Sequence, residues 1–444
     1  MHGAPTARVS AVDDRCGLVR EVRMQRLHGR LYSCFADLAD ADPFGIAAGN
    51  PTVAGADWHD PDQAQRRAVG EALERYCATQ IPTDRLVWGR WTELTGAVDP
   101  NMQVLYSATQ RNRPGFPFTG LHRDAEHAWT RGSDPQGRGV LVPAGLVWLS
   151  PGPHAELAGR PTNLPIAAGL AAGPDPASAA TTAGQRPERA PGDSGDPTRT
   201  AALAELVERH ALATAWLAGS SFPPLSGPEL GPGPVPGVRL AWHQVPNRWR
   251  APVVLCSAHG DDGTLGVGCA LKPAAADPVA TAAAASAAEA VQALHTVRLV
   301  TAGVPQWEQP VGPLRPHRPD REYTAAYAAD GHDITDLTCH LQLLADPAYA
   351  ARVTRRLTSG PSTGAPTGHG WSPQRQDLER VLRADGLTPI TVDVTTSDVS
   401  TLDMRVLRVL VPGLRSTTPG AFPQLMDGID PLPATIEATV IPLA

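Results

Sequence analysis

Apolar residues recur at helical spacing in three long stretches of the chain, 60–80, 198–219 and 277–300. The first and third stretches open with Asp-Pro, a pair suited to an N-cap followed by a proline in the first turn. The second stretch ends at Gly219, and the third is unusually rich in alanine. The pattern therefore predicts three long helices.

Short apolar runs between these stretches predict strands. The runs 139–149 and 251–258 are rich in Val and Leu. Two later runs, 388–396 and 404–413, show partial alternation of apolar and polar residues and are separated by a turn, so we expect them to pair. Strands alternate with helices along the chain, which predicts a mixed α and β protein.

Three segments are predicted to be irregular: 174–200, 223–237 and 358–373. Each is rich in Pro, Gly, Ser and Thr and has few large apolar residues, so it cannot bury enough surface to offset the entropy lost on ordering. The segment 174–200 lies between two stretches that belong together. We therefore interpret it as an insertion within a domain and not as a domain boundary.

Composition and charge narrow the function classes. The chain of 444 residues has a formal net charge of -7 and no basic cluster, which argues against nucleic-acid binding. No apolar run approaches the roughly 20 residues of a membrane helix, and the first residues lack a signal-peptide pattern. The six cysteines form no C-x-x-C pair. We expect a reduced, cytoplasmic protein that binds neither nucleic acid nor membrane.

The three predicted helices share an acidic core: EALER at 71–75, ELVER at 205–209 and EAVQA at 289–293. Each core places a Glu and, three residues later, a Glu or Gln on one face of the helix. Such oxygen donors suit Mg²⁺ together with phosphate oxygens and water, and a neighbouring arginine can bind phosphate through two hydrogen bonds. A single E-x-x-E pair is more often a solvated helix face, although here Ala, Val and Leu crowd the pairs. Spacing alone leaves both interpretations open.

The sequence around these cores resembles the YcaO family. RRAVGEALERYCA resembles the first signature helix of the family, and AAEAVQALH resembles the third. LPIAAGLAAG, followed after the insertion by AALAELVERHA, resembles the second signature, in which a Gly-Ala-Ala-Gly turn leads into the helix. The order of the remaining segments also fits. The resemblance implies one YcaO-like domain of the α+β class over residues 9–444. In this single mixed α/β domain, the Ala-rich helices carry a site for ATP and Mg²⁺.

The resemblance also implies an activity. YcaO cyclodehydratases use ATP and Mg²⁺ to phosphorylate a backbone amide oxygen of a ribosomally made precursor peptide, and Cys, Ser or Thr then becomes an azoline, the reduced form of a thiazole or oxazole. No catalytic residue is assigned. The implied metal ligands are Glu71, Glu74, Glu205 and Glu208. The implied nucleotide contacts are Arg209, Glu289 and Gln292, with Arg67 as a further phosphate contact.

The C-terminal segments point to a branch of the family. DVTTSDV, VLRVLVPGL and FPQL resemble azoline-forming members that work beside a separate leader-peptide-binding protein. The resemblance therefore implies such a partner, the precursor peptide and a homodimer.

Several family positions differ in this chain. Arg67 stands where the family has Ser, Ala168 where it has a polar residue, and Leu294 where it has Arg. The usual Pro-rich tail is reduced to Pro431 and Pro433 in DPLPA, with Pro442 near the end. Two alternatives therefore stay open: a weakly catalytic YcaO-like scaffold that binds a peptide or partner enzyme, and a YcaO enzyme that makes a thioamide or an amidine.

Overall fold

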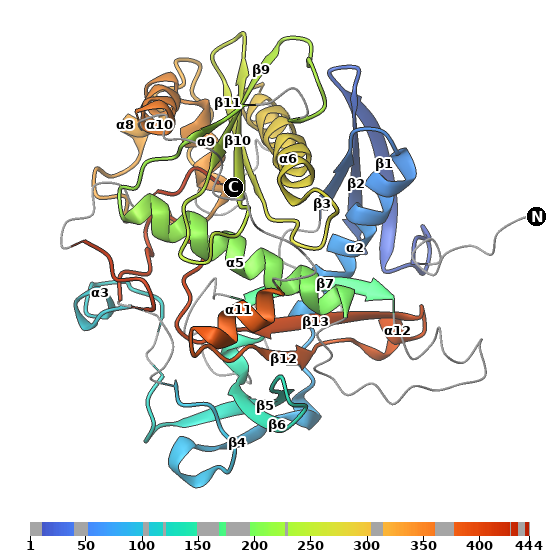
Figure 1. Ribbon diagram of the computed structural model, residues 1–444, viewed down its shortest axis with the longest axis vertical. Helices are drawn as coiled ribbons and strands as arrows, with labels where there is room; N and C mark the ends of the chain where they lie inside the picture. The colour runs from blue at the N-terminus through green and yellow to red at the C-terminus, as the bar shows by residue number, and fades with distance from the viewer. Residues whose placement is uncertain are drawn as a thin grey trace, which may run out of the picture.

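The computed structural model consists of three antiparallel sheets and three long helices (Figure 1). It describes residues 11–39, 52–100, 106–118, 121–148, 168–174, 196–226, 230–302, 314–359, 377–426, 428–433 and 440–443.

The first sheet contains three strands in the order β1-β2-β3, namely β1 (Val19–Leu27), β2 (Leu31–Leu38) and β3 (Thr52–Asp57). Helix α2 (Pro61–Thr79) packs on β2 and β3. The approach is close at Gly55, where a Cβ would lie 2.3 Å from the backbone nitrogen of Ala68.

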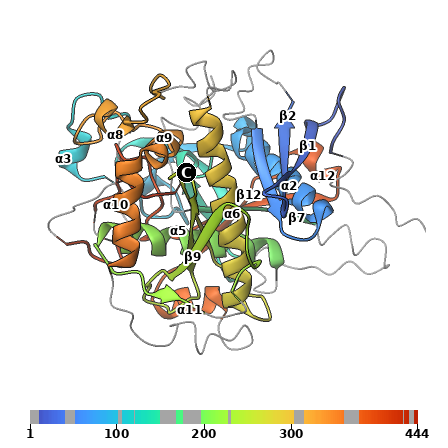
Figure 2. The ribbon, with the colours of Figure 1, turned by 90° about the horizontal axis from the view of Figure 1, so that it is seen from above.

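The second sheet has the strand order β11-β10-β9-β8. Its strands are β8 (Pro224–Leu225), β9 (Val238–Gln244), β10 (Val254–Gly260) and β11 (Leu265–Ala270). Helix α6 (Pro278–Thr301) packs on β10 and β11. Viewed from above, α6 lies between the first sheet on one side and α9 (Thr338–Ala345) and α10 (Pro347–Thr358) on the other (Figure 2).

The third sheet has the order β4-β5-β12-β13-β7, and β6 pairs with β5. Its strands are β4 (Val87–Arg90), β5 (Glu126–Ser133), β6 (Gly139–Pro143), β7 (Ala168–Pro174), β12 (Ile390–Asp393) and β13 (Met404–Leu410). Helix α5 (Pro197–Leu217) packs on β7 and β13. The shorter helices are α3 (Ala108–Arg111), α8 (Tyr323–Ala326), α11 (Leu378–Ala384) and α12 (Ser397–Ser400), with 3-10 turns at Thr83–Arg85, Trp91–Glu93 and Ala144–Leu146.

The three predicted long helices are confirmed as α2, α5 and α6. Each begins at a proline after an aspartate whose side chain accepts a hydrogen bond from the first turn: Asp60, Asp196 and Asp277. Because β7 ends at Pro174 and α5 starts at Pro197, the predicted insertion 174–200 overlaps the strand by one residue and the helix by four, 197–200. Residues 175–195 lie outside the described part of the chain.

Two further predictions about strands need correction. The predicted strand 139–149 ends at Pro143, where the ring removes the N–H needed to continue the ladder, and a 3-10 turn follows. The Gly-Ala-Ala-Gly segment expected to form a turn is strand β7, paired along its whole length with β13. The predicted pair 388–396 and 404–413 is confirmed as β12 and β13, with Ile390 opposite Leu410. In the described part of the chain, no helix combines the length and apolar character needed to cross a membrane.

Candidate active site

Strand β7, at the edge of the third sheet, lies between α2 and α5 (Figure 1). At the free edge of the strand, Oε1 of Glu74 in α2 accepts a hydrogen bond from the backbone N–H of Ala172, 2.7 Å away. On one face of the strand, a Cβ at Gly173 would lie 2.0 Å from the Thr198 hydroxyl of α5. The missing side chain at Gly173 therefore allows α5 to approach the strand this closely. Strand β7 therefore brings the first two acidic helices together.

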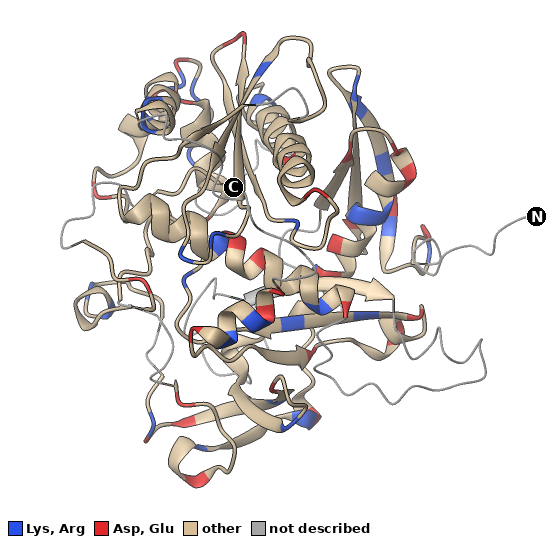
Figure 3. Cartoon of the chain, viewed as in Figure 1, with Lys and Arg blue, Asp and Glu red and all other residues tan. Residues whose placement is uncertain are grey.

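Strand β11 joins α5 to α6 in the same way. The carboxylate of Glu208 in α5 accepts a hydrogen bond from the backbone N–H of Leu271, 2.9 Å away, just after β11. Two residues earlier, the backbone N–H of Cys269 donates to Glu289 of α6 over 3.3 Å. All three helices carry acidic positions along their length (Figure 3).

Two glycines of β11 allow α6 to lie directly on the strand. A Cβ at Gly266 would lie 2.1 Å from the carbonyl oxygen of Ala290, and one at Gly268 would lie 2.3 Å from that of Ser286. The contacted atoms belong to the helix backbone and cannot rotate away. The glycines therefore fix the distance between β11 and α6, and with it the position of Glu289.

The environment of Glu74 disfavours a negative charge. Desolvation by the surrounding protein raises the pKa of this carboxyl well above its usual value, and the charges of Glu71 and Glu205 raise it further. The hydrogen bond from Ala172 acts in the opposite direction. Glu74 is nevertheless partly exposed to solvent, so a ligand can reach it. A cation beside this carboxylate would relieve the repulsion.

Burial also raises the pKa of the carboxyls of Glu208 and Glu289. Desolvation raises the pKa of Glu208 well above its usual value, and the charge of Glu289 adds to this effect, while Lys272 counteracts it. Desolvation raises the pKa of Glu289 to about 7, again against the effect of Lys272. Glu208 is partly exposed and Glu289 is exposed, so both lie at the surface of the site.

Arg209 is the cation that interacts with all three helices. It forms an ion pair with Glu205 one turn earlier in α5. Desolvation acts to lower the pKa of Arg209, but the charges of Glu205, Glu208, Glu71 and Glu289 raise it overall. These carboxylates come from α2, α5 and α6. The three acidic cores therefore form one electrostatically connected site.

The donor set of this site fits Mg²⁺ held jointly with phosphate. Its carboxylates outnumber its cations Arg209 and Lys272 and repel one another. Within the described ranges, no three Asp, Glu, His or Cys side chains lie close enough together to hold one ion by themselves. Mg²⁺ commonly binds through one or two carboxylates and takes its other ligands from phosphates and water.

A match to a protein-family model identifies the family to which this chain belongs. The model describes a YcaO cyclodehydratase that binds ATP and Mg²⁺, and it matches residues 59–184 and 190–415. The chain belongs to the YcaO family. This match confirms the suspected family and, at the family level, the cofactors ATP and Mg²⁺.

Solved structures confirm the expected fold of a YcaO protein. A heterocyclase in complex with substrate and cofactor has a TM-score of 0.63 and 14% sequence identity, over 94% of this chain and 53% of that one. The E. coli microcin synthetase McbBCD complex with pro-MccB17 bound has a TM-score of 0.55 and 12% identity, over 95% of this chain and 96% of that one. This chain thus spans about half the length of the first of these chains. No curated protein matches it.

Two of the predicted nucleotide contacts of this YcaO protein interact with the first sheet. Arg67 forms an ion pair with Asp57 over 3.2 Å and donates a hydrogen bond to the carbonyl oxygen of Ala56. The side-chain amide of Gln292 donates to the hydroxyl of Ser33 over 2.9 Å. Both residues therefore lie where α2 and α6 meet that sheet. Their contact with a nucleotide stays a prediction, as do the ligand roles of the four glutamates.

The residues that differ from the YcaO pattern have distinct surroundings. Leu294 is fully buried in an apolar cluster and packs against Gly266, so the position suits an apolar side chain. The side chain of Ala168 lies outside the described part of the structure. Glu71, one of the predicted metal ligands, pairs with Arg75 over 3.3 Å.

The sequence interpretation missed two basic residues of the site. Lys272 acts on the pKa of both Glu208 and Glu289. Lys272 is the only lysine in a chain that otherwise uses arginine. This exception was the signal in the sequence that could have marked the residue. Arg408 lies in β13, and burial and the charge of Arg209 lower its pKa while the charge of Glu205 raises it. The sequence signal for Arg408 was a charged residue within the apolar run VLRVLV.

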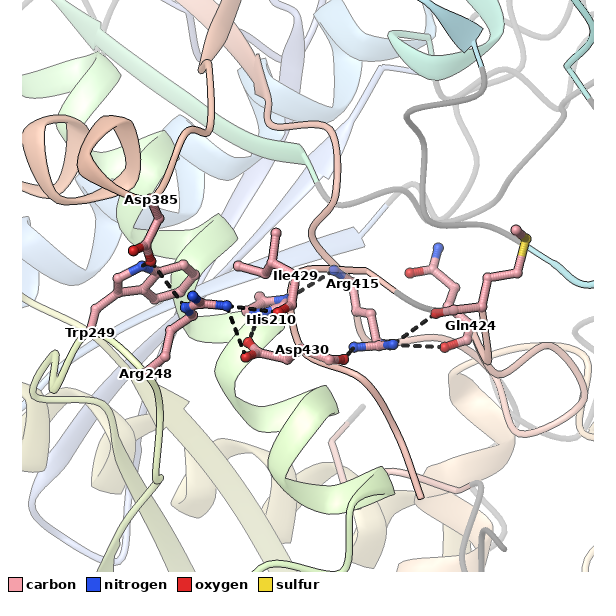
Figure 4. Close-up of polar contacts among 9 residues, drawn as sticks. His210, Arg248, Trp249, Asp385, Arg415, Gln424, Ile429 and Asp430 are labelled. Carbon is pink, nitrogen blue, oxygen red and sulfur yellow. Dashed lines mark hydrogen bonds and ion pairs between the residues drawn. The ribbon is translucent and has the colours of Figure 1, made fainter. Parts of the chain in front are cut away.

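A polar network joins the C-terminal segment to α5 directly after Arg209 (Figure 4). His210 is 1% exposed, and its Nε2 lies 3.0 Å from Oδ2 of Asp430. Its Nδ1 accepts a hydrogen bond from the backbone N–H of Arg415 over 2.9 Å. These contacts identify a neutral imidazole with the proton on Nε2, in agreement with a pKa that desolvation lowers.

Arg415 extends this network into the C-terminal segment. Its buried guanidinium donates to the carbonyl oxygens of Gln424 over 3.2 Å and Met426 over 2.7 Å, and also to that of Asp430. Because His210 and Arg209 are consecutive, this network holds the C-terminal segment close to the acidic site. It also restrains the backbone at the end of the E-L-x-E-R motif.

Proposed function

We propose that this YcaO protein is an ATP- and Mg²⁺-dependent cyclodehydratase that converts Cys, Ser or Thr residues of a ribosomally made precursor peptide to azoline rings. One observation carries the proposal. Glu74, Glu208 and Glu289 come from three different helices, and each accepts a backbone N–H of an adjoining strand segment. Family membership supports ATP and Mg²⁺ as the ligands of these carboxylates.

The chemistry requires activation of a poor leaving group. When bound, ATP with Mg²⁺ supplies the phosphoryl group that converts the amide oxygen into phosphate. The substrate side chain adds to the preceding carbonyl carbon, and the carbon–oxygen bond then breaks, so each ring costs one ATP and releases ADP and phosphate. The protein contributes placement and charge neutralisation.

Individual residues have separate tasks in this proposal. Glu71, Glu74, Glu205 and Glu208 would hold Mg²⁺ together with phosphate oxygens and water. Arg209 holds phosphate through its guanidinium, because this group remains charged beside the carboxylates. Glu289 and Gln292 line the nucleotide, and Arg67 is a further contact whose guanidinium would first have to leave Asp57.

Partners of this chain are part of the proposal. The microcin synthetase that shares the fold is a complex of several proteins with a pro-peptide bound. This supports a precursor peptide as substrate and a separate leader-binding protein as partner. A homodimer remains a prediction from the family resemblance, and a cytoplasmic location remains a prediction from the sequence.

A weakly catalytic scaffold is the second candidate. The observation that favours it is Leu294, which is buried in an apolar cluster where the family has an arginine. This position therefore provides no charge for the nucleotide. In the scaffold, the carboxylate site would bind a peptide or a partner enzyme without turnover.

Reconstitution distinguishes these functions. The protein is mixed with ATP, Mg²⁺, the leader-binding protein and the precursor peptide encoded beside it. The cyclodehydratase removes the mass of one water per ring and releases an equal amount of phosphate. A thioamide-forming enzyme given sulfide increases the peptide mass, because sulfur replaces oxygen. An unchanged peptide mass together with no nucleotide binding would reject the enzymatic proposal.

A further inference from the structure

Strand β1 forms an open edge of the first sheet. It pairs with β2 on one side, and on the other side Val19 forms backbone hydrogen bonds with Ala11 and Asp13. Within the described part of the chain, no residue pairs with the outer side of this strand over 20–27. Figure 2 shows β1 at the outer side of the first sheet. An edge of this length can accept a further strand.

The backbone groups at this open edge can be assigned from the hairpin that follows β1. The carbonyl oxygen of Leu27 accepts a hydrogen bond from the N–H of Arg30, so the backbone groups of Leu27 point toward β2. These directions alternate along an antiparallel strand. The N–H and C=O groups of Val22, Met24 and Arg26 therefore point to the open edge.

The side chains of these three residues share one face of the sheet, because side chains two apart in a strand point the same way. Val22 packs against the apolar cluster that includes α2, and Cys34, which lies opposite Met24, is buried in that cluster. Helix α2 packs mainly on β2 and β3, and Met24 is 42% exposed. Only one other large apolar side chain in the described ranges is as exposed. An apolar residue on an added strand would cover Met24.

The open edge is basic, although the whole chain has a net charge of -7. Arg23 forms ion pairs with Glu21 and Asp37. Arg20 and Arg26 are exposed, and neither forms an ion pair within the described ranges. Two guanidinium groups without a carboxylate therefore flank the apolar part of the edge.

These charges favour an acidic strand over a second copy of β1. Two copies paired antiparallel over 20–26 would place Arg20 opposite Arg26 and Arg23 opposite Arg23. Like charges directly opposite each other destabilise a pair of strands, whereas opposite charges stabilise it. The strand that fits this edge therefore carries carboxylates near its ends and apolar side chains between them.

We propose that the open edge of β1 binds an extended acidic segment of a partner protein as a fourth strand of the first sheet. Apolar side chains of the partner lie against Val22 and Met24, and its carboxylates pair with Arg20 and Arg26. The backbone hydrogen bonds provide affinity, and the side chains provide specificity. This interaction involves neither nucleotide nor the acidic site, so it does not depend on the proposed function.

The test uses a peptide designed for this edge. A fluorescent peptide with blocked ends, Glu-Thr-Leu-Thr-Val-Thr-Glu, places its glutamates and apolar residues on one face of an extended strand. Its matched control carries lysine in place of both glutamates. Fluorescence anisotropy measures the binding of each peptide to the full chain. The wild type is expected to bind the acidic peptide about fivefold or more tightly than the control.

Two variants locate the binding at β1. Arg26→Glu reverses the charge at one end of the edge, so it is expected to bind the lysine peptide more tightly than the acidic one. Met24→Pro removes an N–H at the open edge, where proline is tolerated, and is expected to abolish the binding of both peptides. Met24→Thr keeps the N–H and a side chain suited to strands, so it should still bind the acidic peptide.

Several outcomes would overturn the proposal. They are no binding of the acidic peptide to the wild type, equal affinities for the two peptides, and full binding by a folded Met24→Pro. Circular dichroism checks the fold of each variant, and the charge reversal at the exposed Arg26 tests the proposal even if Met24→Pro unfolds. Analytical ultracentrifugation tests the alternative occupant. A wild-type dimer that Met24→Pro converts to a monomer would show that a second copy pairs with β1 and would overturn the acidic partner.

Discussion

The carboxylate of Glu208 accepts a hydrogen bond from the backbone N–H of Leu271, 2.9 Å away and directly after β11. Leu271 follows Cys269 by two residues, and the backbone N–H of Cys269 donates to Glu289 of another helix. One strand thus positions carboxylates of α5 and α6. Because these donors belong to the backbone, the positions of the two N–H groups do not depend on a side-chain rotamer.

The affinity for Mg²⁺ and ATP is expected to increase with pH. The pKa of Glu289 is raised to about 7 and that of Glu208 is also raised, so both carboxyls hold protons at acidic pH. A bound cation requires the deprotonated forms, and protons therefore compete with it below neutral pH. Calorimetric titration at pH 6 and pH 8 measures this change. For each proton that the cation displaces, the affinity should fall by up to about tenfold for every unit by which the pH is lowered.

Lys272 offers a control for this pH dependence. Its charge lowers the pKa of Glu289, so Lys272→Met should move the pH midpoint of the affinity upward. Lys272→Arg retains the charge and should keep the midpoint of the wild type. An affinity that does not change with pH in all three proteins would contradict this account of the site.

Gly268→Ala is expected to disturb the position of Glu289. The added methyl group would lie 2.3 Å from the carbonyl oxygen of Ser286 and 2.6 Å from the Cβ of Glu289, so α6 must move away from β11. We expect a loss of about 1–3 kcal/mol in the free energy of unfolding and weaker nucleotide binding. Denaturant titration and calorimetry measure these two effects.

Gly139→Ala is the matched control for this substitution. Gly139 lies in β6, and among the residues that the structure describes no atom beyond its two chain neighbours lies within 4 Å of the position that an added methyl group would take. Its free energy of unfolding should change by less than about 0.5 kcal/mol. Equal effects of the two alanine substitutions would show that the close packing of α6 on β11 is unimportant.

The network of His210 and Asp430 is expected to make stability depend on pH. Desolvation lowers the pKa of His210, so the folded protein resists a proton that the unfolded chain accepts below about pH 6.5. The stability that comes from neutral His210 is therefore present above that pH and is lost as the pH falls. His210→Gln should be less stable than the wild type by about 1–3 kcal/mol at pH 7.5, because its two hydrogen bonds are disturbed.

Urea denaturation at pH 7.5 and pH 5.5 tests this expectation. The difference in free energy of unfolding between the wild type and His210→Gln should shrink at the lower pH, since glutamine cannot take up the proton. A difference that stays constant or grows would show that His210 is not held neutral by the fold.

The sequence predicted the helices of the site better than the strands. Asp-Pro openings and apolar periodicity located α2 and α6 closely, because capping and amphipathic packing are local properties. Strand β7 was expected to be a turn, because the segment resembles the Gly-Ala-Ala-Gly turn of the YcaO family. Its Gly173 instead allows the close approach of α5, which depends on contacts between distant parts of the chain.

The basic residues of the site show a similar limit. The spacing of Glu205, Glu208 and Arg209 marked these residues because they lie within one turn of a helix. Lys272 and Arg408 come from other segments of the chain, and only in the folded chain do their charges interact with those of the carboxylates. Their distance along the sequence from each acidic core left no spacing to recognise.

The central claim is that the carboxylates of α5 bind Mg²⁺ and nucleotide, and a double variant tests it most directly. Glu205→Gln with Glu208→Gln removes both charges, while the amide oxygen at 208 can still accept the Leu271 N–H. Circular dichroism checks the fold, and calorimetric titration with Mg²⁺ and a non-hydrolysable ATP analogue measures binding. The account predicts saturable binding to the wild type and none to the folded variant. Equal affinities of the two proteins would contradict it.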